Sequence, residues 1–258
     1  MRFSANLGFL WADLALPDAI RAAHRAGFDA VECHWPYAVA PEAVADALRE
    51  TGLPMLGLNT ERGDVAAGEN GLSALPGREA EARAAIDRAV SYAAAIGAKN
   101  VHVMAGFTQG ADAEAAFVSN LRYGADRAAP HGIGLLIEPL NGYDAPGYFL
   151  SRTDQAIAIL DAVGRDTVQL MFDCYHVQLL EGDLSHRLER HLPRIGHIQF
   201  ASVPDRGPPD RGEVDYAYVF ERIRALGYGA PLGAEYKPRG VTEETLGWLR
   251  AVRGPERE

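Results

Sequence analysis

The chain of 258 residues is poor in cysteine, in positive charge and in long apolar runs, and each shortage excludes a class of protein. Its two cysteines, Cys33 and Cys174, form no Cys-x-x-Cys pair, so neither a disulfide framework nor a zinc ribbon is indicated. Lysine and arginine number 25 against 35 aspartates and glutamates, a formal net charge of −10. Because phosphate binding needs a basic footprint, this balance argues against a nucleic-acid partner.

Signals for export or membrane insertion are also lacking. No apolar run approaches the ~18 residues of a membrane span. The N-terminal stretch reaches Asn6, Asp13 and Asp18 too early for the apolar core of a signal peptide. No Gly-x-Gly-x-x-Gly follows the first apolar run, so a dinucleotide site is not indicated. We expect a soluble protein of the reducing cytoplasm, with no membrane partner.

Short apolar runs alternate with alanine-rich helical segments through the whole chain. The eight strand candidates are residues 3–9, 30–35, 54–60, 100–106, 134–140, 168–175, 195–202 and 231–238. The clearest helices cover residues 16–27, 41–52, 78–97 and 214–227, each ending in glycine. Strict alternation of this length predicts an α/β fold with a parallel sheet, a single (β/α)8 TIM barrel over residues 1–258. A short disordered tail is expected at about 253–258.

Four consecutive predicted strands each carry one oxygen-bearing side chain near their ends: Glu138, Asp173, Gln199 and Glu235. In a TIM barrel the chemistry lies at this edge, and alternation along a strand lets each side chain point toward the barrel axis. Any one of them alone could be a helix cap or a salt-bridge partner. Together, three carboxylates would repel one another without a cation, and no lysine or arginine lies within the fifth to seventh strands. A hard, all-oxygen set favours Mg²⁺ or Mn²⁺ over Zn²⁺.

Five separated motifs stand out along the chain: "RGDVAAGENGLSALPGRE", "EPLNGYD", "FDCYHVQ", "GHIQFASVPDRGPPDRGEVDY" and "GAEYKP". Together they resemble the hydroxypyruvate isomerase family within the xylose-isomerase-like TIM barrels. The resemblance implies a metal held by Glu138, Asp173, Gln199 and Glu235, with Glu138 and Glu235 as the acid/base pair. Related ketose 3-epimerases have histidine where Gln199 stands, so the glutamine favours the isomerase branch.

The function expected from these residues is the metal-dependent interconversion of an aldose and a ketose form of a small hydroxy-oxo acid. The substrate would be hydroxypyruvate, giving 2-hydroxy-3-oxopropanoate, or a 2-oxo-tetronate homologue. Two glutamates on opposite sides of the substrate can move a proton between neighbouring carbons through a metal-bound enediolate. A hydride shift stays open. The alternatives are a ketose 3-epimerase or sugar isomerase, a non-catalytic sugar-acid binder, and an apurinic endonuclease.

Three further residues are substrate-binding candidates. His176 could hydrogen-bond a substrate oxygen or be a structural loop histidine. Arg206 could bind a substrate carboxylate bidentately or be solvated, and Lys237 could assist it from the same face as Glu235 or be a surface lysine.

The remaining features singled out in the sequence are weaker. His102 and His197 are expected as core histidines, whereas the histidines at 24, 131, 186 and 191 are predicted at the surface. The long segment 60–78 is a candidate lid or subunit contact. Assembly into a homo-oligomer stays open.

Overall fold

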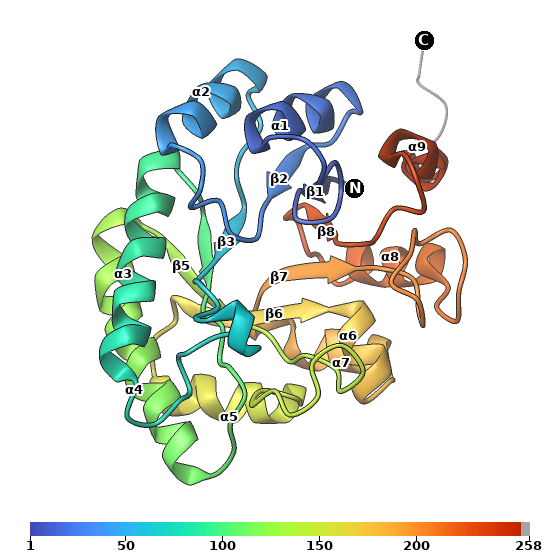
Figure 1. Cartoon of the computed structure of the whole chain (residues 1–258). Coiled ribbons are helices and arrows are strands. Elements are labelled where there is room, and N and C mark those ends of the chain that lie inside the picture. The colour runs from blue at the N-terminus through green and yellow to red at the C-terminus, as the bar shows by residue number, and fades with distance from the viewer. Residues whose placement is uncertain (254–258) are drawn as a thin grey trace.

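The computed structural model describes residues 1–253, in which eight parallel strands form one sheet rolled into a barrel (Figure 1). The strands are β1 (Phe3–Asn6), β2 (Ala30–Glu32), β3 (Gly57–Asn59), β4 (Asn100–His102), β5 (Gly134–Ile137), β6 (Val168–Asp173), β7 (Ile195–Phe200) and β8 (Leu232–Ala234). Their order in the sheet is β2-β1-β8-β7-β6-β5-β4-β3. The predicted α/β barrel fold is confirmed.

The barrel closes between β2 and the segment that leads into β3. Val31 forms a parallel bridge with Met55, and the Leu56 amide donates to the Val31 carbonyl at 2.7 Å. The Cys33 amide then donates to the Gly57 carbonyl at 3.1 Å. These bonds satisfy backbone groups at the two edges of the sheet, so little open edge is left between β2 and β3.

Helices surround the strands (Figure 1). They are α1 (Leu16–Arg25), α2 (Pro41–Thr51), α3 (Glu79–Ile96), α4 (Ala111–Ala128), α5 (Thr153–Val163), α6 (Cys174–Leu180), α7 (Leu184–His191), α8 (Tyr216–Ala225) and α9 (Gly247–Arg253). Short 3-10 turns lie at Val65–Ala67, Ala129–His131, Leu192–Arg194 and Thr242–Thr245. The predicted glycine stops are confirmed at α2 and α3, where Gly52 and Gly97 adopt left-handed conformations that avoid the strain of a side chain.

The predicted strands extend too far at their C-terminal ends. The clearest case is β6, predicted to residue 175, because α6 already begins at Cys174. The Asp173 carboxylate accepts a hydrogen bond from the Tyr175 amide at 2.9 Å and so caps that helix. His176 therefore lies in a helix and not in a loop. Arg253 is the last residue of α9, and the rest of the predicted tail, 254–258, lies outside the described residues.

An aromatic cluster fills the space between β1, β7 and the helices α8 and α9. Phe3, Phe200, Phe220 and Trp248 are all buried and pack edge to face, with ring centroids 4.9–5.9 Å apart. Edge-to-face contacts suit the quadrupoles of aromatic rings, and burial of these large apolar surfaces stabilises the fold.

One of the predicted surface histidines is buried. His191 is only 5% exposed, whereas His24, His131 and His186 are exposed as expected. The prediction for His191 is wrong because the residue shares a helix face with Leu184 and Leu188, at spacings of seven and three residues, and that face of α7 packs inward.

The long segment 60–78 is folded against β4 and its extension. The Ser73 and Ala74 amides donate to the Met104 and Ala105 carbonyls, and Gly71 pairs with Ala105. A Cβ at Gly71, which has φ +114°, would meet the Met104 carbonyl at 2.7 Å, so glycine is required at this crossing. Among residues 1–253, the structure contains no helix with the length and hydrophobicity needed to span a bilayer.

Candidate active site

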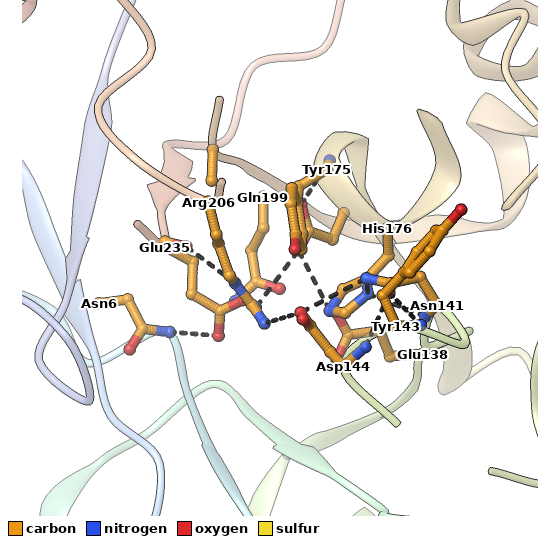
Figure 2. Close-up of polar contacts among 12 residues, drawn as sticks. Asn6, Glu138, Asn141, Tyr143, Asp144, Tyr175, His176, Gln199, Arg206 and Glu235 are labelled. Atoms are coloured by element: carbon orange, nitrogen blue, oxygen red, sulfur yellow. Dashed lines mark hydrogen bonds and ion pairs between the residues drawn. The ribbon is translucent and has the colours of Figure 1, made fainter. Parts of the chain in front are cut away.

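The four predicted ligands come together at the C-terminal ends of strands β5 to β8. Glu138 follows β5, Asp173 ends β6, Gln199 lies near the end of β7, and Glu235 follows β8. Asp173 is the register partner of Gln199, so these two side chains lie at the same height. All four residues are at most 5% exposed. Figure 2 shows Glu138, Gln199 and Glu235 converging with Arg206 and His176.

Three of the converging oxygen atoms are buried without any hydrogen-bond partner among residues 1–253. They are Oε1 of Glu138, Oδ2 of Asp173 and Oε1 of Gln199. A buried acceptor without a donor loses its hydration and gains nothing in return. Two carboxylates and one amide carbonyl form a hard oxygen set, which fits a divalent cation as the missing partner.

Glu235 differs from the other carboxylates because both its oxygens are paired. Oε1 accepts hydrogen bonds from Asn6 Nδ2 and His34 Nε2, each at 2.9 Å, and Oε2 forms an ion pair with Arg206. Burial by itself raises the pKa of Glu235, but the Arg206 guanidinium and the His34 hydrogen bond together lower it below its usual value.

The pKa values of Glu138 and Asp173 shift the other way. Burial, followed by repulsion from Glu235 and Asp173, raises the pKa of Glu138 well above its usual value. Burial also raises the pKa of Asp173 to about 7, against the opposing attraction of Arg206. Both shifts have the same physical meaning, that the protein alone supplies too little positive charge to keep three buried carboxylates ionised.

Arg206 supplies the positive charge that strands β5 to β7 lack. It comes from the loop after β7, with left-handed backbone at φ 51°. Its guanidinium lies 3.2 Å from Asp144 Oδ2 and 3.6 Å from Asp173 Oδ2, in addition to its pairing with Glu235. The Phe9 and Tyr175 rings flank it with centroids at 5.0 and 4.9 Å. Stacking between two rings holds the planar guanidinium at the mouth of the barrel.

His176 is oriented by Asn141. The Asn141 backbone N–H, which can only donate, faces His176 Nδ1 at 3.0 Å, so Nδ1 is an acceptor. Burial lowers the pKa of His176, and the neutral ring therefore carries its hydrogen on Nε2. This Nε2 lies 4.0 Å from Glu138 Oε1 and 3.7 Å from Asp173 Oδ2. Glu138, Asp173 and His176 could share an ion by distance, since one atom of each lies within 4.8 Å of the others. The tautomer instead makes His176 a hydrogen-bond donor.

Lys237 does not join the cluster. Its side chain is exposed, its ammonium lies 6.0 Å from the centroid of the Phe9 ring, and its backbone amide donates to the Arg206 carbonyl at 2.7 Å. The residue therefore lies at the rim of the mouth, near Arg206.

Among the site residues that the sequence interpretation missed are Asn6, Glu32 and His34, which come from β1 and from β2 and its continuation. Asn6 and Glu32 are register partners on neighbouring strands, and both are buried. Glu32 follows two apolar residues in a short strand. It therefore carries the same signal as Glu138, a carboxylate at the end of an apolar run. Of the two expected core histidines, His197 is paired with Glu32, whereas neither ring nitrogen of the buried His102 has a hydrogen-bond partner in the part of the chain that the structure describes.

A parallel barrel with this polar mouth corresponds to a known family. The family model for the xylose isomerase-like TIM barrel matches residues 20–252. The chain therefore belongs to the xylose isomerase-like TIM barrel family.

Individual relatives define the class further. The 2-oxo-tetronate isomerase of Cupriavidus necator is 46% identical, with 98% of this chain and 99% of that protein aligned. The hydroxypyruvate isomerase of Escherichia coli is 38% identical over 98% of this chain and all of that protein. A crystal structure described as AP endonuclease, family 2, from Brucella melitensis is 40% identical, with a TM-score of 0.93 over 100% of this chain and 99% of that one. The resemblance to hydroxypyruvate isomerases is confirmed, and the protein is an isomerase.

Proposed function

We propose that this isomerase acts on a small hydroxy-oxo acid, either hydroxypyruvate, giving 2-hydroxy-3-oxopropanoate, or a 2-oxo-tetronate homologue. The names of the two isomerase relatives support this substrate class. The observation that carries the proposal is the set of three buried oxygens without partners at the barrel mouth. Burying these oxygens without donors lowers the stability of the fold. Their arrangement fits a site that binds a cation and an oxygen-rich substrate.

Glu138, Asp173, Gln199 and Glu235 would hold the cation, which we propose to be Mg²⁺ or Mn²⁺ because every ligand atom is an oxygen. When bound, the cation supplies an electrophile that stabilises negative charge on two neighbouring substrate oxygens. Arg206 pairs with Oε2 of Glu235, so the guanidinium and the cation would compete for this carboxylate.

Glu138 and Glu235 are proposed as the proton-transfer pair. They extend from β5 and β8, with β6 and β7 between them, so a substrate over Asp173 and Gln199 has one glutamate on each side. One carboxylate removes a proton from the carbon that bears the hydroxyl group, which leaves an enediolate. A proton returned to the former carbonyl carbon, together with transfer of the hydroxyl proton to the former carbonyl oxygen, completes the isomerisation. A positioned base contributes about 10²–10⁴-fold to such a reaction.

His176 and Arg206 are proposed to bind the substrate. The Nε2–H group of His176 faces Glu138 and Asp173 and can donate to a substrate oxygen held there. Arg206 offers a fork of donors that matches a carboxylate, and the substrate carboxylate would replace Asp144 or Glu235 as its partner. Lys237, exposed at the rim, adds positive charge to the approach for an anionic substrate.

A ketose 3-epimerase is the nearest alternative. Gln199 argues against it, because the related ketose 3-epimerases have histidine at this position. The Brucella structure raises the second alternative, a nuclease. A net charge of −10 is unsuited to a DNA groove. We place the reaction in the cytoplasm, since the two thiols are free and buried.

The decisive experiment is a substrate panel. Protein stripped with chelator and reloaded with Mg²⁺ or Mn²⁺ is incubated with hydroxypyruvate, 2-oxo-tetronate and free ketohexoses. The products, an aldehyde from hydroxypyruvate and a 3-oxo acid from 2-oxo-tetronate, are followed by NMR. We expect turnover of one or both acids and none of the hexoses. Epimerised hexose without acid turnover would support the epimerase, and cleavage of an abasic-site duplex would support the nuclease.

A further inference from the structure

Glu32 is a buried carboxylate that the proposed reaction does not use. It ends β2 and is 4% exposed. Its Oε1 atom accepts hydrogen bonds from Gln199 Nε2 at 2.8 Å and from Asn6 Nδ2 at 3.0 Å, and its Oε2 atom lies 2.6 Å from His197 Nε2. Each of the two Glu32 oxygens is therefore occupied, in contrast to the partnerless oxygens of Glu138 and Asp173.

The hydrogen bond from Gln199 to Glu32 fixes which end of the amide reaches the cation site. An amide has a donating NH₂ end and an accepting carbonyl end, and a carboxylate can bind only the first. With Nε2 held by Glu32, the carbonyl Oε1 atom is the end left free, and it is one of the three partnerless oxygens. The opposite rotamer would set oxygen against the Glu32 carboxylate and direct an NH₂ group toward the ligands, where it would repel a cation.

Asn6 connects Glu32 to a second proposed metal ligand, Glu235. Its Nδ2 atom donates to Glu32 Oε1 at 3.0 Å and to Glu235 Oε1 at 2.9 Å, and its Oδ1 atom accepts from the Gly8 amide at 2.9 Å. Every group of the Asn6 amide is thus used in one orientation. Figure 2 shows the contact from Asn6 to Glu235.

We propose that Glu32 is a positioning residue, which presents the carbonyl of Gln199 and, through Asn6, the carboxylate of Glu235 to a divalent cation. This inference rests on the proposed function, because it takes Gln199 and Glu235 as ligands. Glu32 touches neither the cation nor the substrate. Its effect on metal binding passes through the Gln199 and Asn6 amides, which distinguishes it from a carboxylate that merely attracts a cation by its charge.

A double-mutant cycle on Mn²⁺ binding tests this, with free Mn²⁺ measured by electron paramagnetic resonance during titration of the metal-free protein. The four proteins are the wild type, Glu32→Leu, Gln199→Leu and the double variant. We expect Glu32→Leu to weaken Mn²⁺ binding by about 10–100-fold, the usual range for groups that orient metal ligands. In the Gln199→Leu background the same substitution should cost clearly less affinity, because the Gln199 amide is gone and only the contact through Asn6 to Glu235 is left.

The conservative variant Glu32→Gln separates hydrogen bonding from charge. Its amide oxygen can still accept from Gln199 and Asn6, while its charge is lost. We expect a smaller loss of affinity than in Glu32→Leu, and the loss should again shrink when Gln199 is leucine. If Glu32→Leu fails to fold, the cycle that combines Glu32→Gln with Gln199→Leu still tests the inference.

Glu181→Leu is the matched control. Glu181 is also a buried carboxylate, but its partners are Arg152, Arg187 and the Thr153 amide, outside the cluster. We expect its substitution to lower the unfolding temperature and leave Mn²⁺ affinity unchanged.

Four results would overturn the inference. Wild-type affinity in Glu32→Leu would show that the carboxylate does not position the ligands, although the metal site itself would stand. A loss that persists at full size in the Gln199→Leu background, or equal losses in Glu32→Gln and Glu32→Leu, would point to charge alone. A wild-type protein that binds no Mn²⁺ would overturn the metal site and the role of Glu32 together.

Discussion

Two adjacent residues of β7, Gln199 and Phe200, belong to opposite kinds of environment. Phe200 points outward into the aromatic cluster, 4.9 Å from the Phe220 ring and 5.3 Å from the Trp248 ring, and is fully buried. Gln199 points to the barrel mouth, where its carbonyl oxygen has no partner. The alternation of a strand thus places a packed region and an unsatisfied region one residue apart. Stability and function can therefore be changed separately on the same strand.

The largest expected effect lies in the unsatisfied region. Glu138→Gln keeps the size and one oxygen of the side chain but removes a base, so we expect turnover to fall by about 10²–10⁴-fold. The unfolding temperature should not fall, because no hydrogen bond of Glu138 is lost. Initial-rate kinetics on the substrate identified by the panel measure the fall in turnover. Thermal unfolding checks that the unfolding temperature does not fall. Unchanged turnover would exclude Glu138 from proton transfer.

The packed region should show the reverse pattern. Phe200→Ala removes the centre of the aromatic cluster and leaves a cavity, so we expect a loss of about 3–5 kcal/mol in the free energy of unfolding. Urea unfolding of the metal-free protein measures it. Because Gln199 and Asp173 keep their register, the folded fraction should retain wild-type Mn²⁺ affinity. Tyr218→Ala, at a tyrosine that is 53% exposed, is the control and should change stability little. A strong loss of affinity in folded Phe200→Ala would mean that the two regions are coupled.

Adding metal should stabilise only proteins whose oxygen set is intact. A ligand at 100 times its dissociation constant stabilises the native state by about 2.7 kcal/mol. We expect Mn²⁺ to raise the unfolding temperature of the wild type and of Phe200→Ala accordingly, and that of Asp173→Ala far less. Calorimetric scans with and without Mn²⁺ measure the difference. Equal stabilisation of Asp173→Ala would place the bound ion elsewhere.

The same contrast explains what the sequence could predict. The eight strands and the inward oxygens of Glu138, Asp173, Gln199 and Glu235 follow from local signals, namely apolar runs and the residue that ends each of them. Strand ends were misjudged because a cap such as that of Asp173 on α6 replaces strand by helix without a break in hydrophobicity.

The missing parts of the site depend on contacts between distant segments. Asn6 on β1 reaches Glu235, which follows the neighbouring strand β8, 229 residues along the chain. Arg206 was a predicted substrate-binding residue, but its pairing with Asp173 and Glu235 from a loop was not predicted. No periodicity or spacing encodes such a pair. Glu32 is different, because a carboxylate at the end of an apolar strand was already the signal that identified Glu138.

The smallest expected effect concerns two buried glutamates, whose substitution by glutamine should change the free energy of unfolding in opposite directions. Burial and neighbouring carboxylates raise the pKa of Glu138. At any pH above the ordinary pKa of a glutamate, keeping Glu138 in the metal-free fold therefore costs stability. Glu138→Gln should raise the free energy of unfolding by about 1 kcal/mol. Glu181 lies 3.3 Å from Arg187 and accepts from the Thr153 amide at 2.9 Å, so Glu181→Gln should lower the free energy by about 1–3 kcal/mol. Urea unfolding in chelator at pH 8 compares the two variants with the wild type. If both substitutions destabilise the protein equally, the carboxylates at the mouth are not held at a cost to stability, and the separation between the two regions fails.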